Sequence, residues 1–344
     1  MTTHGSIMES EIAQTPEIFK TLVNGNIIPE ELRSVLKSRS IQSILILARG
    51  TSDNAAHFLK YLIETQLGLP CGLCSPSSVS IYDSKLHYEN TLVISISQSG
   101  KSTDLVQFAL RAKESGATLV SITNDSQSPL ATSAHFHIPL QAGPEIAVAA
   151  TKSYSAQLLI SYLLVASWAG KDPLAQSLFT EAQRVLKASP EIAQIAKSID
   201  LGSELTILGR GFAYPNAKEA ALKIQETCKI NVQGMSTADY LHGPISSLNS
   251  DSQVIVLAPM HMPQNSVNEA IDRVRAITKK IYWIGSGAES LAHEYVVPGA
   301  LCDDEIRSSI VDSMALQLFA MHLAVSNGFN PDAPTGLSKV TLTI

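Results

Sequence analysis

The stretch ILARGTSDNAAHFLKYLIE (46–64) has a counterpart later in the chain, ILGRGFAYPNAKEAALKIQE (207–226). Each begins with an apolar run, passes through an Arg-Gly turn and enters a segment whose apolar residues have helical spacing. A strand, a turn and a helix of the same design in both halves favour an internal duplication over chance similarity. We therefore expect two copies of one α/β unit to fill the chain.

The regions around each copy extend this pattern. Near-continuous apolar runs alternate with helical patterns, which is typical of a parallel sheet with helices on both faces. The expected strands are 41–48, 91–96, 117–123, 134–140, 203–211, 252–259 and 279–287, and the expected helices are 54–67, 104–115, 155–170 and 267–277. We interpret the chain as α/β, with each half a flavodoxin-like three-layer sandwich.

Two domains fit a chain of 344 residues. We place an N-terminal segment at 1–25, a first domain at 26–185 and a second domain at 186–344. The linker is expected near 170–200, where AGKDP (169–173) and SPE (189–191) interrupt the helical pattern.

Composition excludes several classes of function. The net charge of −6 argues against nonspecific nucleic-acid binding, which needs basic patches. The N-terminus lacks a signal-peptide pattern, and the apolar stretch 155–170 is too short and too rich in serine to span a bilayer. We therefore expect a cytoplasmic protein that contacts neither membrane nor nucleic acid.

Cys71 and Cys74 form a C-x-x-C without a second pair, so buried thiols are favoured over a metal or redox site.

The segment SISQSGKSTDL (95–105) lacks one glycine of a nucleotide-binding P-loop, because Ser95 stands at that position. Ser95 lies within an apolar alternation, so we assign it to a strand and Lys101 to the surface. The loop then begins at Ser97, which is too late for a full P-loop turn. What remains is a short serine loop suited to a phosphate monoester rather than to ATP.

Three loops leave the ends of strands in the first half, where open parallel sheets bind their ligands: 48–55, 97–104 and 142–153. The first two are rich in hydroxyl groups, and each precedes an expected helix, whose free N–H groups favour an anion. Helix capping alone would explain one such loop. Two adjacent loops of this kind favour a phosphate site.

With these motifs in view, the chain resembles the tandem sugar-isomerase (SIS) family from about residue 40 to the C-terminus. It is similar to the isomerase half of glucosamine-6-phosphate synthase and to the SIS-type glucosamine-6-phosphate deaminases. The motifs that carry the resemblance are ARGTS, SQSG, AGPEIAVAATK, LGRGFAYPNAKEAALKIQE, LHGP and the terminal LSKVT.

The resemblance implies a phosphosugar site in the first half. It assigns the sugar phosphate to hydroxyl and amide side chains, and the expected substrate-binding residues there are Thr51, Ser52, Ser97, Gln98, Ser99 and Ser102. The family's V-A-S loop contacts the sugar near its reactive end. Here that loop reads Val148-Ala149-Ala150, so one hydroxyl contact is absent.

The expected catalytic residues follow later in the chain. Glu219, Lys223 and Glu226 share one helix face, which by spacing alone is more typical of a solvated Glu–Lys–Glu surface. The resemblance instead implies that Glu226 moves the proton between C1 and C2 and that His242 opens the sugar ring. Lys339 would act near the carbonyl group. Glu219 would orient water or the amino group, and Lys223 would be a partner of the two glutamates.

The resemblance implies a homodimer in which His242 reaches the neighbouring subunit's site, with no cofactor. His135 and His137 could suggest a metal, but without a third ligand packing is the better interpretation. The chain starts M-T-T-H and has no cysteine before Cys71, so a glutaminase domain is not expected.

We therefore expect a glucosamine-6-phosphate deaminase that releases fructose 6-phosphate and ammonia. Several alternatives stay open. They are a related phosphosugar isomerase, a galactosamine-6-phosphate deaminase, a fructosamine-6-phosphate deglycase, a non-catalytic phosphosugar sensor and, least favoured, a P-loop kinase.

Overall fold

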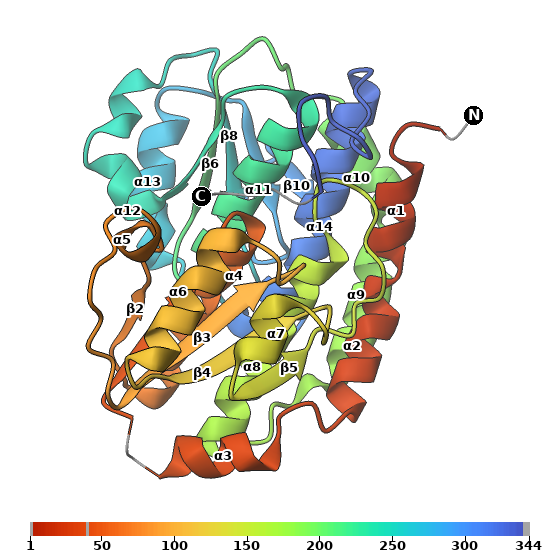
Figure 1. The fold of residues 1–344 in the computed structure, drawn as a ribbon. Coiled ribbons are helices and arrows are strands. Elements are labelled where there is room, and N and C mark those ends of the chain that lie inside the picture. The colour runs from red at the N-terminus through yellow and green to blue at the C-terminus, as the bar shows by residue number, and fades with distance from the viewer. Residues whose placement is uncertain (1–2, 39–40, 340–344) are drawn as a thin grey trace. The chain divides into compact units, whose positions relative to one another are not determined.

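The computed structural model describes residues 3–38 and 41–339, which form two compact units (Figure 1). The β1–β5 unit comprises 18–145 and 156–174, with Ser338 and Lys339. The β6–β10 unit comprises the residues up to Glu17, together with 146–155 and 175–337. Each unit thus draws on separated parts of the chain, whereas the domains expected from sequence, 26–185 and 186–344, are continuous; those limits stay a prediction.

The β1–β5 unit contains a five-stranded sheet in which all neighbouring strands are parallel, in the order β2-β1-β3-β4-β5. Its strands are β1 (Ser43–Leu47), β2 (Cys71–Leu73), β3 (Thr91–Ser97), β4 (Thr118–Thr123) and β5 (Phe136–Pro139). Every residue of β3 is buried, which explains why its sequence is nearly continuous in apolar residues.

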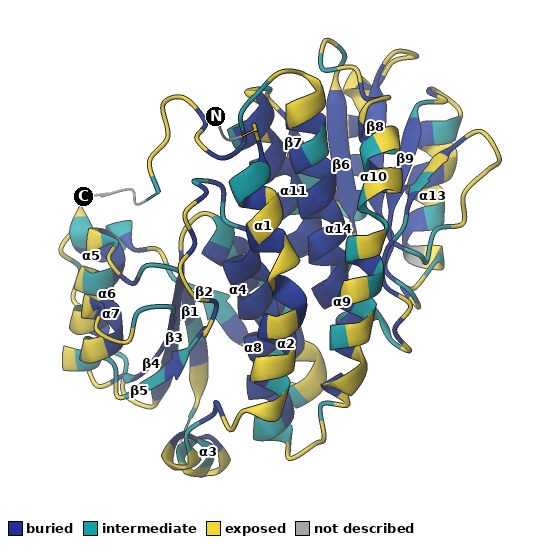
Figure 2. Ribbon diagram, turned by 90° about the vertical axis from the view of Figure 1, so that its right-hand side faces the viewer, coloured by how far each residue is buried: buried dark blue, intermediate teal, exposed yellow. Residues whose placement is uncertain are grey.

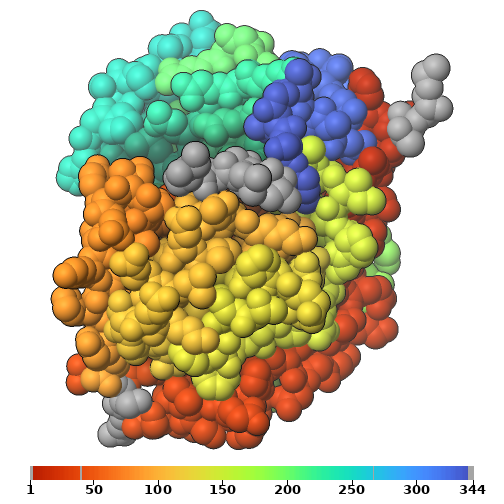
Figure 3. Space-filling view, viewed as in Figure 1, coloured from red at the N-terminus to blue at the C-terminus, as the bar shows by residue number. Residues whose placement is uncertain are grey.

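Helices cover both faces of this sheet (Figure 2). One face carries α4 (Thr51–Leu62), which runs into a π-helical turn at Ile63–Leu67, and the part of α8 (Lys152–Ala169) from Ala156 onward. The other face carries α5 (Ser77–Ser80), α6 (Thr103–Glu114) and α7 (Pro129–Ser133), which form the outer surface of the unit in Figure 3. Phe108 and Leu130 pack there against Val93 and Leu119 of the strands.

The β6–β10 unit repeats this design. Its parallel sheet has the order β10-β9-β8-β6-β7, with strands β6 (Leu205–Gly209), β7 (Gln233–Ser236), β8 (Gln253–Leu257), β9 (Ile281–Ile284) and β10 (Tyr295–Val297). Counted in chain order within each sheet, both sheets have the flavodoxin-like order 2-1-3-4-5. The turn after the first strand is also shared, because Gly50 and Gly211 both have a φ of 56°. The α/β class with two parallel sheets is therefore confirmed.

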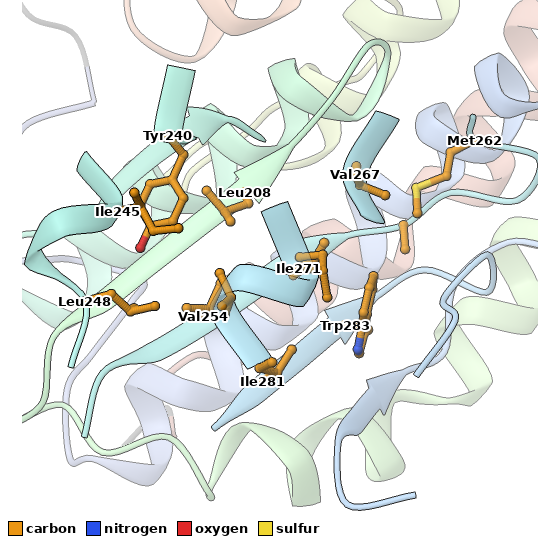
Figure 4. Packing of buried hydrophobic residues seen from close by; sticks show 13 residues of the cluster. Leu208, Tyr240, Ile245, Leu248, Val254, Met262, Val267, Ile271, Ile281 and Trp283 are labelled. Atoms are coloured by element: carbon orange, nitrogen blue, oxygen red, sulfur yellow. The ribbon is translucent and has the colours of Figure 1, made fainter. Parts of the chain in front are cut away.

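Helices also cover both faces of the second sheet. On one face lie α11 (Ala213–Cys228) and α14 (Glu305–Ser326), and α9 (Leu178–Lys187) and α10 (Ser189–Ala196) pack against α14. On the other face lie α12 (Thr237–Leu241) and α13 (Asn265–Arg275). There Tyr240, Ile271 and Trp283 belong to one buried apolar cluster (Figure 4).

The remaining helices precede β1 or connect larger elements. They are α1 (Ser6–Ala13), α2 (Thr15–Asn24), α3 (Glu30–Lys37) and the 3₁₀ turns Ala175–Ser177 and Pro244–Ser247. Residues 178–196, expected to contain a linker, instead form α9 and α10, whose apolar side chains Leu178, Val185 and Ile192 are buried. This part of the stretch 170–200 is therefore helical and packed, and the position of the linker stays a prediction.

Helix α14 is long and apolar enough to cross a membrane by length and composition alone. However, 89% of its most apolar 18-residue window is buried within the structure. The helix therefore has the environment of a core helix.

Candidate active site

The turns after β1 and β3 lie side by side, because these two strands are neighbours in the sheet. The turn after β3 contains Ser97, Gln98, Ser99 and Ser102. Ser97 is buried and its hydroxyl accepts a hydrogen bond from the N–H of Gly100, at 3.1 Å. Ser102 precedes α6, but its side chain makes no capping hydrogen bond. The simple capping explanation therefore fails for Ser102, which favours a ligand-binding turn.

An ion pair that no sequence motif predicted joins these two turns. The Arg49 Nε lies 3.0 Å from the Asp104 Oδ2, and Asp104 is buried at the start of α6. The side chain of Arg49 remains 50% exposed, so a cation stands beside the hydroxyl-rich turns. An anion bound here would meet helix N-termini and a guanidinium group. The Arg-Gly turn of the internal repeat was the signal that could have identified Arg49.

Helix α8 fixes the hydroxyl of Ser52 in the first turn of α4. The Gln157 Nε2 donates to the Ser52 Oγ at 2.9 Å, and both residues are buried. Ser95 is fully buried within β3, and the Lys101 side chain is 54% exposed and lies 3.4 Å from Asp125. Both placements agree with the assignments made against a P-loop.

Lys339 forms an ion pair within the β1–β5 unit. Its Nζ lies 2.8 Å from the Oε2 of Glu145, whose side chain is fully buried. Glu145 belongs to the AGPE segment that precedes the expected substrate loop. The neighbouring Asn124 fixes the start of this segment, because its side chain bonds Ala142 N–H and Gly143 C=O.

In the β6–β10 unit, one helix presents the predicted Glu–Lys–Glu group. The Lys223 Nζ lies 3.5 Å from Glu219 Oε1 and 2.5 Å from Glu226 Oε2. Glu219 and Lys223 are fully buried, whereas the Glu226 side chain is 23% exposed. The interpretation as a solvated surface is therefore wrong. A buried ammonium group between two carboxylates holds Glu226 in a fixed orientation while leaving it accessible.

His242 follows α12 and is exposed. Its backbone N–H donates to the carbonyl of Asp239, which closes the helix. Among the described residues, no hydrogen bond or ion pair joins the His242 side chain to the Glu–Lys–Glu group. Gly243 follows with a φ of 154°, a backbone conformation that favours glycine and lets the chain turn directly after the histidine.

The substrate loop expected from the resemblance, Val148 to Ala150, also belongs to the β6–β10 unit. Val148 and Ala150 are half-buried.

At the turn after β6, Glu305 accepts a hydrogen bond from the N–H of Phe212. Burial raises the pKa of Glu305 to about 7. No motif in the sequence singled out this acid, because α14 brings it to the turn from almost a hundred residues away.

The predicted site residues thus form two groups, one in each unit.

His135 precedes strand β5 and His137 lies within it, and both make hydrogen bonds consistent with packing. The His135 Nδ1 accepts from Leu119 N–H, and the His137 Nε2 lies 2.9 Å from Thr123 Oγ1. The thiols of Cys71 and Cys74 are free, and burial raises the pKa of each to about 12.

Comparison with known proteins supplies the family. Residues 39–167 match the SIS domain. The isomerizing glutamine–fructose-6-phosphate aminotransferase of Methanothermobacter thermautotrophicus is 33% identical, over 90% of this chain and 53% of the relative. The chain thus spans about half the length of the curated relatives it matches.

Solved structures agree with this relationship. A candidate phosphosugar isomerase from Silicibacter pomeroyi DSS-3 is 29% identical, with a TM-score of 0.80 over 95% of this chain and 99% of the other. The C-terminal domain of glucosamine-fructose-6-phosphate aminotransferase from Francisella tularensis shares the fold, with a TM-score of 0.85 and 24% identity over 95% of this chain and 98% of the other. The chain therefore contains an SIS domain, at residues 39–167.

Proposed function

We propose that the chain is a glucosamine-6-phosphate deaminase built from two tandem SIS domains. The observation that carries this proposal is the Glu219–Lys223–Glu226 group, in which one accessible carboxylate is oriented by a fully buried amine. The hydroxyl-rich turns after β1 and β3, with Arg49 beside them, supply a site suited to a phosphate monoester.

The reaction would proceed as follows. The sugar phosphate binds to the serine turns, and His242 transfers a proton from the anomeric hydroxyl to the ring oxygen, which opens the ring. Glu226 removes the proton from C2 and returns it to C1, so that the amino aldose becomes the imine of fructose 6-phosphate. Water adds to C2, ammonia leaves, and fructose 6-phosphate remains. A carboxylate positioned on one face of the substrate suits this two-step proton transfer.

Ammonia release from glucosamine 6-phosphate, coupled to glutamate dehydrogenase, tests the proposal. We expect Glu226→Gln to reduce kcat by about 10²–10⁴-fold, the usual contribution of a general base. Glu269→Gln is the matched control, because Glu269 is exposed on α13. No release by the unaltered protein, or equal rates in both variants, would refute the proposed activity.

A related phosphosugar isomerase is the second candidate, supported by the family match and by the similarity to the candidate isomerase from Silicibacter pomeroyi. Such an enzyme would use Glu226 in the same way on a sugar without nitrogen. Aldose–ketose conversion of a phosphosugar without an amino group, with no ammonia from amino sugars, would select this alternative.

We further propose that the chain acts as a homodimer in which His242 completes the neighbouring subunit's site. Support comes from the exposed position of His242 and from the absence, among the described residues, of a hydrogen bond or ion pair between its side chain and the Glu–Lys–Glu group. Mixing inactive Glu226→Gln and His242→Ala subunits should restore up to about one active site in each hybrid dimer. No recovery after subunit exchange, verified by mass spectrometry of the intact dimers, would contradict this arrangement.

A further inference from the structure

The loop that carries Val148 and Ala150 depends on a carboxylate far away in the sequence. The backbone N–H groups of Ile146 and Ala147 both donate to Glu11, which lies in α1 and is 3% exposed. Because a buried carboxylate is costly unless hydrogen bonds satisfy it, these N–H groups and Glu11 stabilise one another. The first residues of the loop are therefore fixed by α1.

Asp332 connects the same loop to the start of α1. The Val148 N–H donates to the Asp332 backbone carbonyl at 3.0 Å. The side chain of Asp332 accepts hydrogen bonds from Met8 N–H, at 2.8 Å, and Ile7 N–H, at 3.3 Å. Gly5 occupies the N-cap position and has no side chain for capping, so Asp332 caps α1 from a distant part of the chain.

The far end of the loop is held in the same manner. The Lys152 Nζ donates to the Gln14 side chain at 2.7 Å, just beyond α1. The Gln317 Nε2 of α14 donates to the carbonyl of Thr151 at 2.9 Å. Lys152 and Gln317 are both buried. The residues before and after Ala149 and Ala150 are thus fixed by polar groups that belong to other elements of the same unit.

We propose that Glu11 and Asp332 are positioning residues that hold residues 146–150 in the conformation that receives the sugar. Neither residue needs to touch the substrate. Glu11 fixes the loop directly, and Asp332 does so both through its own carbonyl and by capping the helix that carries Glu11. The inference rests on the proposed function only for the identity of the ligand.

The test combines hydrogen exchange with kinetics in Glu11→Gln. This substitution keeps the size of the side chain and removes the charge that the two N–H groups share. Glu9→Gln is the matched control, because Glu9 lies on the same helix and is exposed. Loss of charge-assisted hydrogen bonds should speed exchange in a peptide covering 144–151 by about tenfold and lower kcat/KM for glucosamine 6-phosphate by a similar factor.

Exchange is also measured with and without fructose 6-phosphate, which requires no turnover. We expect this ligand to protect residues 146–150 in the unaltered protein and to protect them less in Glu11→Gln, with Asp332→Asn showing the same direction. If fructose 6-phosphate binds without protecting the loop, or if Glu11→Gln changes neither exchange nor kcat/KM, the positioning role is wrong. If the loop is protected but no ammonia is released by the unaltered protein, the deaminase proposal fails while the positioning role stands.

Faster exchange in Glu11→Gln with unchanged kcat/KM and ligand protection would also overturn the proposal, because Glu11 would then serve stability alone. Asp332→Asn guards against misfolding as an explanation. It retains the backbone carbonyl that binds Val148 N–H and weakens only the cap of α1, so its thermal unfolding should change less than a cavity-forming substitution would.

Discussion

Replacing Asp312 by asparagine should make the protein more stable at alkaline pH. Asp312 lies in α14 and is 1% exposed, its Oδ1 accepts a hydrogen bond from Ala300 N–H, and its Oδ2 has no hydrogen-bond partner among the described residues. Burial raises the pKa of Asp312 from 3.8 to about 8. The folded protein therefore carries a protonated, neutral Asp312 at neutral pH, and asparagine is close to it in shape.

The sign of the pH dependence follows from proton binding. Between the two pKa values, the folded state holds a proton on Asp312 that the unfolded state has released, so stability falls as pH rises. The contribution is complete below the unfolded pKa and is lost as pH rises through the folded pKa. Each pH unit in this window removes about 1.4 kcal/mol, so the free energy of unfolding should fall by about 3–4 kcal/mol between about pH 5 and about pH 8 from this group alone.

Urea unfolding, followed by circular dichroism at both pH values, measures this difference. In Asp312→Asn the contribution should disappear, so the variant gains stability relative to the unaltered protein as pH rises. Asp303→Asn is the control, because the Asp303 side chain is 95% exposed. Parallel pH profiles for the unaltered protein and Asp312→Asn would refute the assignment of a neutral buried acid.

Three further predictions concern the site and the thiols. Ser97→Ala should raise KM for the sugar phosphate by about tenfold, because one hydrogen bond to a charged group is lost. Lys101→Ala should change steady-state kinetics little. A large loss of activity in Lys101→Ala would restore the P-loop hypothesis. Lys223→Met should lower the free energy of unfolding by about 3–5 kcal/mol, because it leaves a buried carboxylate without its partner, and a change below about 1 kcal/mol in urea unfolding would contradict this. Cys71 and Cys74 should react with Ellman's reagent far more slowly in the folded protein than in urea, both near pH 8. The reason is that burial raises the pKa of both thiols to about 12 in the folded protein. Equal rates would show that the thiols are accessible.

The sequence predicted the inner strands of the first sheet well because their patterns are local. The strands expected at 91–96 and 117–123 correspond to β3 and β4, whose apolar runs report burial on both faces. The edge strands β2 and β10 were missed because each has only three residues, and β7 was missed because its sequence, QGMS, has no apolar run. Helix α14 was missed because nearly all of its residues are buried, including the polar Arg307, Asp312 and Gln317, so its sequence lacks an amphipathic pattern.

The site was predicted in part for similar reasons. Local motifs identified the serine turns and the spacing of Glu219, Lys223 and Glu226. The ion pair of Arg49 with Asp104 and the contacts of Glu11 with the substrate loop depend on which segments meet in space. No spacing along the sequence encodes these contacts, so only the structure could reveal them.

The distance between the partners of α1 has a consequence for how the protein folds. Helix α1 leaves the ribosome long before its cap, because Asp332 is synthesised 324 residues after Met8. An eight-residue helix is marginal in water without tertiary contacts. The nascent β1–β5 sheet can assemble from segments already made, whereas α1 and the loop at 146–148 must wait until Asp332 has been synthesised. Completion of this part of the molecule is thus a late event, and chaperone binding or proteolysis before that point would act on exposed α1.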